Sequence, residues 1–250
     1  DSQIVTLLNK RIATSLEIAQ VKKSVGKSVY SPDREREVLK KIASLNKGPL
    51  SSQALEAVYR EVMSASLAQA KSLTIAYLGP QATFTQLAAM KRFGSQVTYL
   101  PCENIDEVFI EVEKDNADFG VVPIENSIEG AVNHTLDMFV DSDLMICAQI
   151  ILDVAHNLLA KCSKEQIKSV YSNPQVFGQC RIWLQENLSG VEIVEVSSTT
   201  RAAQIAGERK HSACIASLLA AKIYGLKVIA KSIEDSPHNI TRFLVIGKTD

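Results

Sequence analysis

Apolar side chains at the start of the chain recur at the three- and four-residue spacing of amphipathic helices. A first helix, running to about Val25, would carry one apolar stripe made of Ile4, Leu7, Leu8, Ile12, Leu16 and Ala19. Gly26 interrupts it, and Ser31 as N-cap with Pro32 at the first helical position predicts a second helix over 32–45. A third helix, after Ser51-Ser52, would turn inward Leu55, Val58, Val62 and Leu67. Three helices of such unequal length cannot close a core alone, so we expect a bundle completed by a second copy of the chain.

After Leu73 the hydrophobic period changes, and short apolar runs alternate with helical segments. The runs predict strands near 74–78, 97–100, 119–123, 144–154, 169–171, 192–196, 213–216, 227–231 and 242–246. Helices are expected in most of the gaps. This alternation is typical of an α/β fold.

Polar residues follow four of these strands, at 79–85, 123–127, 172–175 and 197–200. Each set alone is an ordinary helix N-cap. Together, at the carboxyl ends of strands in an open sheet, they would face a ligand crevice in which helix starts attract an anion. The pattern predicts a small anionic ligand held by neutral donors. The glycine motifs of phosphate loops and dinucleotide folds are absent from the sequence, so nucleotides are not indicated.

The formal net charge of −1 hides a division near Leu73. Residues 1–73 hold 12 Lys and Arg against 7 Asp and Glu, whereas residues 74–250 hold 15 against 21. All four His and all five Cys lie in the second part. This change of composition predicts a domain boundary at that point, and neither half is charged strongly enough to indicate nucleic acid.

Several classes of protein are excluded. The sequence has no apolar run of the roughly 18 to 20 residues that cross a bilayer and no secretory leader, so we expect a cytoplasmic protein without membrane contact. The Cys residues are odd in number and show no metal-ligand spacing, which indicates reduced thiols. We therefore expect neither a metal site nor a cofactor.

Charged residues in the helical part suggest a binding pocket. Arg11 and Lys22 are separated by about three turns, roughly 16 Å along one helix face, so both can point into one cavity. Arg34 and Glu35 lie in the first turn of the next helix. On spacing alone, solvated helix charges are the simpler interpretation. Taken together, these positions and the stretch 31–35 resemble the all-helical chorismate mutase domain, in which two chains interlock.

That resemblance implies roles for each residue. Arg11 and Arg34 would hold the substrate carboxylates, Lys22 would donate to the ether oxygen and Glu35 would accept the ring hydroxyl. A Claisen rearrangement needs only a folded conformer and such donors. Two departures matter: the family's Arg near the start of the first helix is missing, and Ala70 stands where the family has Gln or Glu. We expect that residues precede Asp1 in the natural protein.

The remainder resembles prephenate dehydratase over essentially all of 74–248. The matching motifs are Tyr77-Leu78-Gly79-Pro80 with Thr83-Phe84-Thr85, Val122-Pro123-Ile124-Glu125-Asn126-Ser127, Tyr171-Ser172 with Pro174-Gln175, Ala216-Ser217, and Asn239 with Thr241-Arg242-Phe243. The whole chain thus resembles the bifunctional chorismate mutase/prephenate dehydratases of phenylalanine biosynthesis. The resemblance implies an all-α mutase-like domain (1–73) and a two-lobed α/β dehydratase domain of the periplasmic-binding-protein type II (74–250), with lobes at about 74–153 plus 233–250 and at about 154–232. It also implies two substrates, chorismate and prephenate, and a homodimer formed through the N-terminal helices.

The dehydratase resemblance also implies site residues. Thr241 would stand beside the departing hydroxyl and act as a hydrogen-bond donor, because a Thr hydroxyl is too weak an acid to be deprotonated. Arg242 would either bind a carboxylate or anchor its loop by an ion pair. Glu125 would orient its neighbours or, with a raised pKa, protonate the leaving group. The substrate-cleft donors would be Thr83, Asn126, Ser127, Ser172, Gln175 and Thr200.

Some features keep alternatives open. His156, in the apolar stretch 153–158 that we interpret as a strand, is either a core or hinge residue or a catalytic one. Ala82 stands where a Gly is common, and we expect its φ to be negative. The family's phenylalanine-binding regulatory domain would follow residue 247. The alternatives to the bifunctional enzyme are a monofunctional prephenate or arogenate dehydratase with a helical dimerisation domain, and a non-catalytic solute-binding module.

Overall fold

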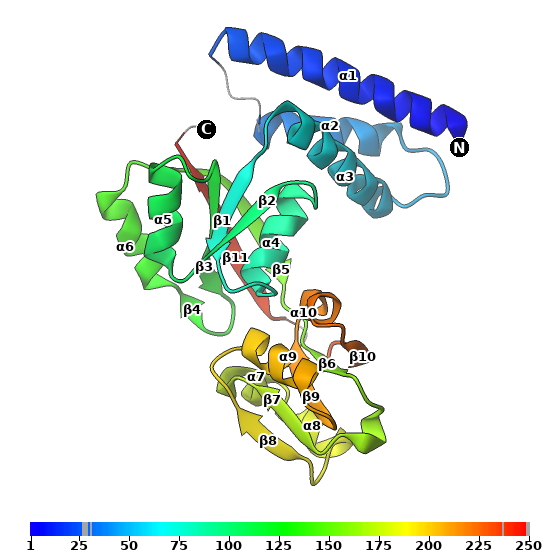
Figure 1. Cartoon of the computed structure of the whole chain (residues 1–250), viewed down its shortest axis with the longest axis vertical. Helices are drawn as coiled ribbons and strands as arrows, with labels where there is room; N and C mark the ends of the chain where they lie inside the picture. The colour runs from blue at the N-terminus through cyan, green and yellow to red at the C-terminus, as the bar shows by residue number, and fades with distance from the viewer. Residues whose placement is uncertain (27–29, 31, 237, 249–250) are drawn as a thin grey trace.

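The chain forms a helical segment followed by two β-sheets with helices packed on them (Figure 1). The computed structural model describes residues 1–26, 30, 32–236 and 238–248. The helical segment contains α1 (Ser2–Ser24), α2 (Pro32–Leu45) and α3 (Ser52–Ala70). The sheets and the helices on them are built from β1 (Thr74–Leu78), α4 (Phe84–Phe93), β2 (Thr98–Cys102), α5 (Ile105–Glu113), β3 (Phe119–Asn126), β4 (Gly130–Ala131), α6 (Asn133–Asp141), β5 (Met145–Asp153), β6 (Asn157–Ala160), β7 (Ser169–Ser172), α7 (Pro174–Gln179), α8 (Arg181–Asn187), β8 (Glu192–Glu195), α9 (Thr199–Glu208), β9 (Ser212–Ala216), α10 (Leu218–Ile223), β10 (Lys227–Ala230) and β11 (Ile240–Gly247).

The three helices of the first segment form as the sequence predicts. Ser51 caps α3, its hydroxyl oxygen accepting the Ala54 N–H at 3.2 Å. The predicted N-cap at Ser31 lies outside the described residues. The expectation that Val58 is turned inward is wrong for a single chain, since 54% of it is exposed. Half of the α1 stripe is also uncovered, with Ile4 60%, Leu7 66% and Leu8 37% exposed, because α3 covers only part of α1.

The first sheet has the strand order β2-β1-β3-β11-β5, with β4 added to β3. Strands β1, β2 and β3 run parallel, and β11 is antiparallel to both of its neighbours. Alternate residues of each strand face opposite sides, so α4 covers one apolar face and α5 covers the other. The first face takes Ile75, Tyr77, Val121, Phe243 and Val245, and the second takes Ala76, Val122, Leu244 and Ile246.

Gly120 in β3 allows α5 to approach this sheet. A Cβ added there would lie 2.7 Å from Val108 Cγ1 and 2.8 Å from Ile246 Cγ1. We expect Gly120→Ala to lower the free energy of unfolding by about 1–3 kcal/mol through overpacking. Gly178→Ala in α7, where nothing lies within 4 Å, should raise it by about 0.5–1 kcal/mol. Urea unfolding of both variants measures the difference, and equal stabilities would contradict the close packing.

The second sheet has the order β10-β6-β9-β7-β8, and the chain passes between the two sheets twice. One crossover segment joins β5 to β6 and the other joins β10 to β11. The two segments are hydrogen-bonded to each other: Val154 N donates to Asn239 O at 2.8 Å, and Ile233 N donates to His156 O at 2.8 Å. This double crossover, at the junction of the two sheets in Figure 1, agrees with the two-lobed fold that the resemblance implies.

The structure confirms all nine predicted strands within a few residues and adds β4 and β6. The interpretation of 153–158 as one strand is wrong. β5 ends at Asp153 and β6 begins at Asn157, so His156 lies in the crossover between the lobes. Val154 and Ala155 continue the apolar character of β5 past Asp153, which obscures the point where the chain leaves one sheet for the other.

Candidate functional site

Thr241 and Asn126 lie side by side where β11 begins and β3 ends. The antiparallel register pairs the two residues directly. Asn126 Nδ2 donates to Thr241 Oγ1 at 2.7 Å, and Asn126 Oδ1 accepts the backbone N–H groups of Ile128 at 2.9 Å and Glu129 at 3.1 Å. These two backbone donors fix which end of the amide carries the oxygen. Thr241 Oγ1 is therefore an acceptor towards Asn126, and the Thr241 proton is available to another group.

The amide network extends from Asn126 into the second lobe. Asn126 Nδ2 also donates to Asn239 Oδ1 at 2.9 Å, and Asn239 Nδ2 donates to Gln179 Oε1 at 2.9 Å. The same Gln179 oxygen lies 2.7 Å from His156 Nε2, so the imidazole must donate from Nε2. Nδ1 then carries no proton, and it is buried without a partner among the described residues. The network connects β3, β11, α7 and the crossover segment. Gln179 and Asn239 were not predicted as site residues. Asn239 belongs to the same family motif as Thr241, and Gln179 is one helical turn beyond Gln175.

Burial keeps His156 neutral and therefore makes stability depend on pH. Burial lowers the pKa of His156, although the bond to Gln179 and the charge of Glu234 oppose this. The unfolded chain, with a His pKa near 6.5, takes up a proton that the folded chain resists. The free energy of unfolding should therefore fall as the pH drops below about 6.5, by up to about 1.4 kcal/mol per pH unit.

Urea unfolding between about pH 8 and pH 5.5 tests this dependence. His156→Gln removes the titrating ring and should flatten the pH dependence, whereas His211→Gln, at an exposed position, should not. If the wild type and His156→Gln lose stability with the same slope, the buried neutral His156 is not its cause.

Two hydroxyl groups of the second lobe donate hydrogen bonds to the loop after β1. Thr200 Oγ1 donates to Gln81 O at 3.1 Å, and Ser217 Oγ donates to Ala82 O at 3.1 Å. The expectation of a negative φ at Ala82 is wrong, because its φ is +69°. Its N–H donates to Gln86 Oε1 at 2.6 Å and its side chain is buried in the second lobe, so bonds on both sides impose this uncommon conformation.

The hydroxyls of three predicted donors are engaged in bonds within the protein. Thr83 caps α4, accepting the Gln86 N–H at 3.3 Å and donating to Leu78 O at 3.2 Å. Ser127 Oγ donates to His238 O and accepts the Ile240 N–H, each at 2.9 Å, and so holds the segment that enters β11. Ser172 is fully buried and donates to Ile215 O at 3.0 Å. Gln175, by contrast, is exposed in the first turn of α7.

Arg242 and Glu125 are cross-strand neighbours that form an ion pair. Arg242 Nη1 lies 3.2 Å from Glu125 Oε2, and about half of each side chain is exposed. Such exposed pairs contribute about 0–1 kcal/mol. The geometry favours the anchoring alternative for Arg242 and an orienting role for Glu125.

The predicted residues of the helical segment make contacts with different partners. Arg11 Nη1 donates to Ser66 Oγ on α3 at 3.0 Å, whereas Glu35 contacts the first lobe through Arg92 Nη2 at 3.2 Å. Arg34 forms an exposed ion pair with Glu37 at 2.8 Å. Lys22 is partly buried in the last turn of α1. Within one chain, Arg11 and Glu35 are therefore bound to different elements.

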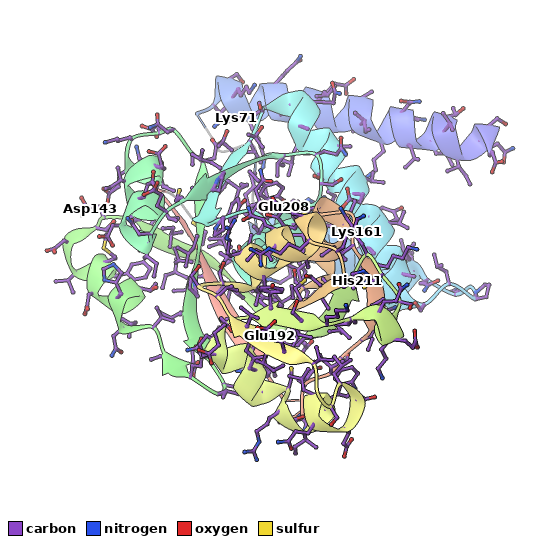
Figure 2. All side chains as sticks on the ribbon, turned by 60° about the horizontal axis from the view of Figure 1, so that its bottom comes forward. Lys71, Asp143, Lys161, Glu192, Glu208 and His211 are labelled. Atoms are coloured by element: carbon purple, nitrogen blue, oxygen red, sulfur yellow. The ribbon has the colours of Figure 1, made fainter. Side chains whose placement is uncertain are left out.

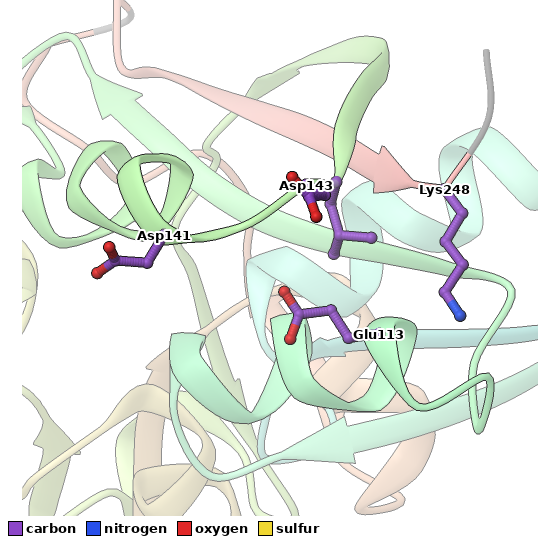
Figure 3. A pocket seen from close by; sticks show the side chains of 5 residues that line it. Glu113, Asp141, Asp143 and Lys248 are labelled. Atoms are coloured by element: carbon purple, nitrogen blue, oxygen red, sulfur yellow. The ribbon is translucent and has the colours of Figure 1, made fainter.

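A hollow on the surface and the grouping of possible metal ligands among the described residues also bear on the chemistry. An open hollow is lined by Glu113, Asp141, Asp143, Leu144 and Lys248 (Figure 3), at the opposite end of β11 from Thr241. Three carboxylates would repel an anionic ligand there. Across the described ranges there is no group of three or more His, Cys, Asp or Glu residues that could hold a metal ion. No described helix has the length and hydropathy to cross a membrane. Lys161, Glu192 and His211 all lie on the second lobe (Figure 2).

Comparisons with known proteins cover both parts of the chain. The family model of prephenate dehydratase matches residues 75–250, and that of chorismate mutase type II matches residues 1–71. The bifunctional chorismate mutase/prephenate dehydratase of Aquifex aeolicus is 45% identical, and that of Pseudomonas aeruginosa is 44% identical; each match covers 100% of this chain and 70% of the relative. The structure of prephenate dehydratase from Arthrobacter aurescens, solved with L-Phe, is 34% identical, with a TM-score of 0.65 over 71% of this chain and 61% of that one. The chain belongs to the family of bifunctional chorismate mutase/prephenate dehydratases.

Proposed function

We propose that residues 74–250 convert prephenate to phenylpyruvate and that residues 1–73 convert chorismate to prephenate. Loss of the ring hydroxyl together with carbon dioxide makes the prephenate ring aromatic, which supplies the driving force. The enzyme must then hold two carboxylates and stabilise hydroxide as it leaves. Residues 154–232 would form the second lobe, and the substrate would lie between that lobe and the first.

The observation that carries the dehydratase assignment is the bond from Asn126 Nδ2 to Thr241 Oγ1 at 2.7 Å. Because Thr241 accepts from Asn126, its own O–H can donate to the departing hydroxyl. A donor placed where negative charge develops stabilises the transition state more than the ground state. Asn239 and Gln179 hold the Asn126 amide in this orientation.

The substrate carboxylates would be held largely by neutral donors. The helices α4 and α9 have Thr83 and Ser198 as their N-caps, on the two sides of the bonded loop at 81–82. Their first turns offer backbone N–H groups and the positive end of the helix dipole. The Glu125 charge is partly balanced by Arg242. The hydroxyls of Thr83, Ser127 and Thr200 would position this backbone, and Gln175 would reach the substrate directly.

For the mutase, Arg11 and Arg34 would bind the carboxylates, Lys22 would donate to the ether oxygen and Glu35 would accept the ring hydroxyl. Ala70 removes one donor that the resemblance implies, so this activity would be the weaker of the two. A dehydratase whose helical segment serves only in dimerisation is the second candidate, and Ala70 is the observation that favours it.

We infer that the helical segment pairs with a second copy of the chain. Ile4, Val5, Leu7 and Leu8 are exposed on the first turns of α1, and a contiguous apolar surface of this kind indicates an interface. We expect Leu7→Glu to raise the Kd of the dimer at least about tenfold, because the substitution places a charge in that interface. Sedimentation equilibrium measures the shift. Glu17→Gln, on an exposed part of α1, serves as the control, and an unchanged dimer would contradict the role of α1.

The proposed function is tested by supplying chorismate and prephenate separately and measuring phenylpyruvate. We expect product from both substrates. Product from prephenate alone would leave the monofunctional dehydratase, and no product from prephenate would overturn the dehydratase assignment. Arogenate, supplied in a third reaction and followed as phenylalanine, separates the two dehydratase substrates.

A further inference from the structure

Three side chains connect the helical segment to the first lobe: Tyr30, Glu35 and Arg92. Tyr30 donates its hydroxyl to Glu35 Oε2 at 3.0 Å, and Arg92 Nη2 lies 3.2 Å from the same oxygen. Arg92 Nε donates to the Tyr30 hydroxyl at 3.1 Å. The Glu35 and Arg92 side chains are only 10% and 20% exposed. This closed triangle is a buried, charge-assisted contact rather than a surface ion pair.

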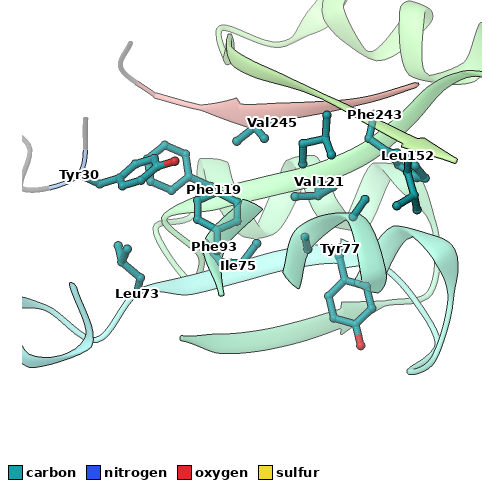
Figure 4. Close-up of a cluster of buried hydrophobic side chains, with 13 residues drawn as sticks. Tyr30, Leu73, Ile75, Tyr77, Phe93, Phe119, Val121, Leu152, Phe243 and Val245 are labelled. Carbon is teal, nitrogen blue, oxygen red and sulfur yellow. The ribbon is translucent and has the colours of Figure 1, made fainter. Parts of the chain in front are cut away.

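Tyr30 is fixed by the core of the first lobe. Its ring centroid lies 5.5 Å from that of Phe93 and 5.1 Å from that of Phe119, and Figure 4 shows it beside these two rings at the edge of the buried cluster. Burial and the neighbouring Glu35 charge raise the pKa of Tyr30, so the hydroxyl stays protonated and donates. The carboxylate of Glu35 is thus held by a hydrogen bond from Tyr30 and by an ion pair with Arg92, and both partners pack against the dehydratase part.

Helix α4 carries Arg92 in its last turn. Its other end is capped by Thr83, next to the loop held by Thr200 and Ser217. A helix of ten residues spans about 15 Å. One rigid element therefore joins the start of the proposed dehydratase cleft to Glu35.

We propose that Arg92, a residue of the dehydratase part, is a positioning residue for the mutase reaction. This rests on the proposed role of Glu35 as the acceptor of the substrate's ring hydroxyl. Arg92 and Tyr30 both contact Oε2, which anchors that oxygen and leaves Oε1 to accept the substrate hydroxyl. The mutase site is then incomplete without the dehydratase part of the same chain.

The test is a double-mutant cycle in the full chain, with chorismate consumption and prephenate consumption measured separately. Arg92→Gln should lower mutase kcat about tenfold, the effect of losing one largely buried ion pair, with little change in KM and in dehydratase turnover. Arg92→Lys should recover part of the loss. Glu35→Gln should lower mutase kcat further, and Arg92→Gln should add nothing in the Glu35→Gln background, because Arg92 acts only through Glu35.

Lys91→Gln is the matched control, since Lys91 is the neighbour of Arg92 on α4 and its Nζ bonds the Ile151 carbonyl at 2.9 Å instead. If Glu35→Gln impairs the mutase while Arg92→Gln behaves like Lys91→Gln, the positioning role is overturned and the proposed function stands. Equal losses from Arg92→Gln with and without Glu35 also overturn it, since they indicate a contact that only docks the two parts. If the wild type consumes no chorismate, the mutase assignment fails, and the role of Arg92 fails with it.

Discussion

Thr241→Val should lower the turnover of prephenate by about 10²–10³-fold, the usual cost of removing one donor from developing negative charge. Val keeps the shape and branching of Thr, so β11 should pair with β3 as before. What is lost is the O–H that the Asn126 bond leaves available for the departing hydroxyl. Prephenate binding should change little, because the interaction strengthens in the transition state.

Three comparisons make this result specific. Thr241→Ser keeps the hydroxyl and should retain activity within about tenfold of the wild type. Thr98→Val makes the same exchange at an exposed strand position and should have no effect. Chorismate consumption by Thr241→Val should equal that of the wild type. Undiminished phenylpyruvate formation by Thr241→Val would remove this residue from the mechanism, whereas binding without turnover would exclude a mere solute-binding module.

The sheets could be predicted because their signal is local. Alternation in β1 and β11, with Ile75 and Val245 facing α4 and Ala76 and Leu244 facing α5, follows directly from the period of a strand. The break between β5 and β6 was missed because Val154 and Ala155 continue the apolar character of β5 past Asp153. Ala82 shows the same limit, because its positive φ is imposed by Gln86 and by Ser217 from the other lobe.

The site was predictable as a set of segments but not as a geometry. The motifs name Asn126 and Thr241, yet only the register of β3 and β11 pairs them. Gln179 joins the network because tertiary packing brings the end of α7 to the crossover residues His156 and Asn239. For Glu35 the resemblance implies a shared pocket with Arg11, whereas the contact of its carboxylate with Arg92 depends on the packing of Tyr30 in the first lobe.

Asn126→Asp should lower dehydratase turnover about as much as Thr241→Val, by about 10²–10³-fold. The introduced carboxylate is nearly isosteric with the amide and can still accept the backbone N–H groups of Ile128 and Glu129. Its other oxygen, however, would face Thr241 Oγ1 and Asn239 Oδ1, where the wild type has a donor. Thr241 would then donate its proton to the introduced carboxylate rather than to the substrate, so the direction of the hydrogen bond would be reversed.

This reversal makes the effects of Thr241→Val and Asn126→Asp non-additive. Once Thr241 is replaced by Val there is no proton to redirect, so the double variant should be about as slow as either single variant. Steady-state kcat with prephenate measures this, and Asn116→Asp, at an exposed site, controls for the added charge. If the two losses multiply instead, Asn126 acts on the substrate independently, as a donor to a substrate carboxylate, and not through the orientation of Thr241.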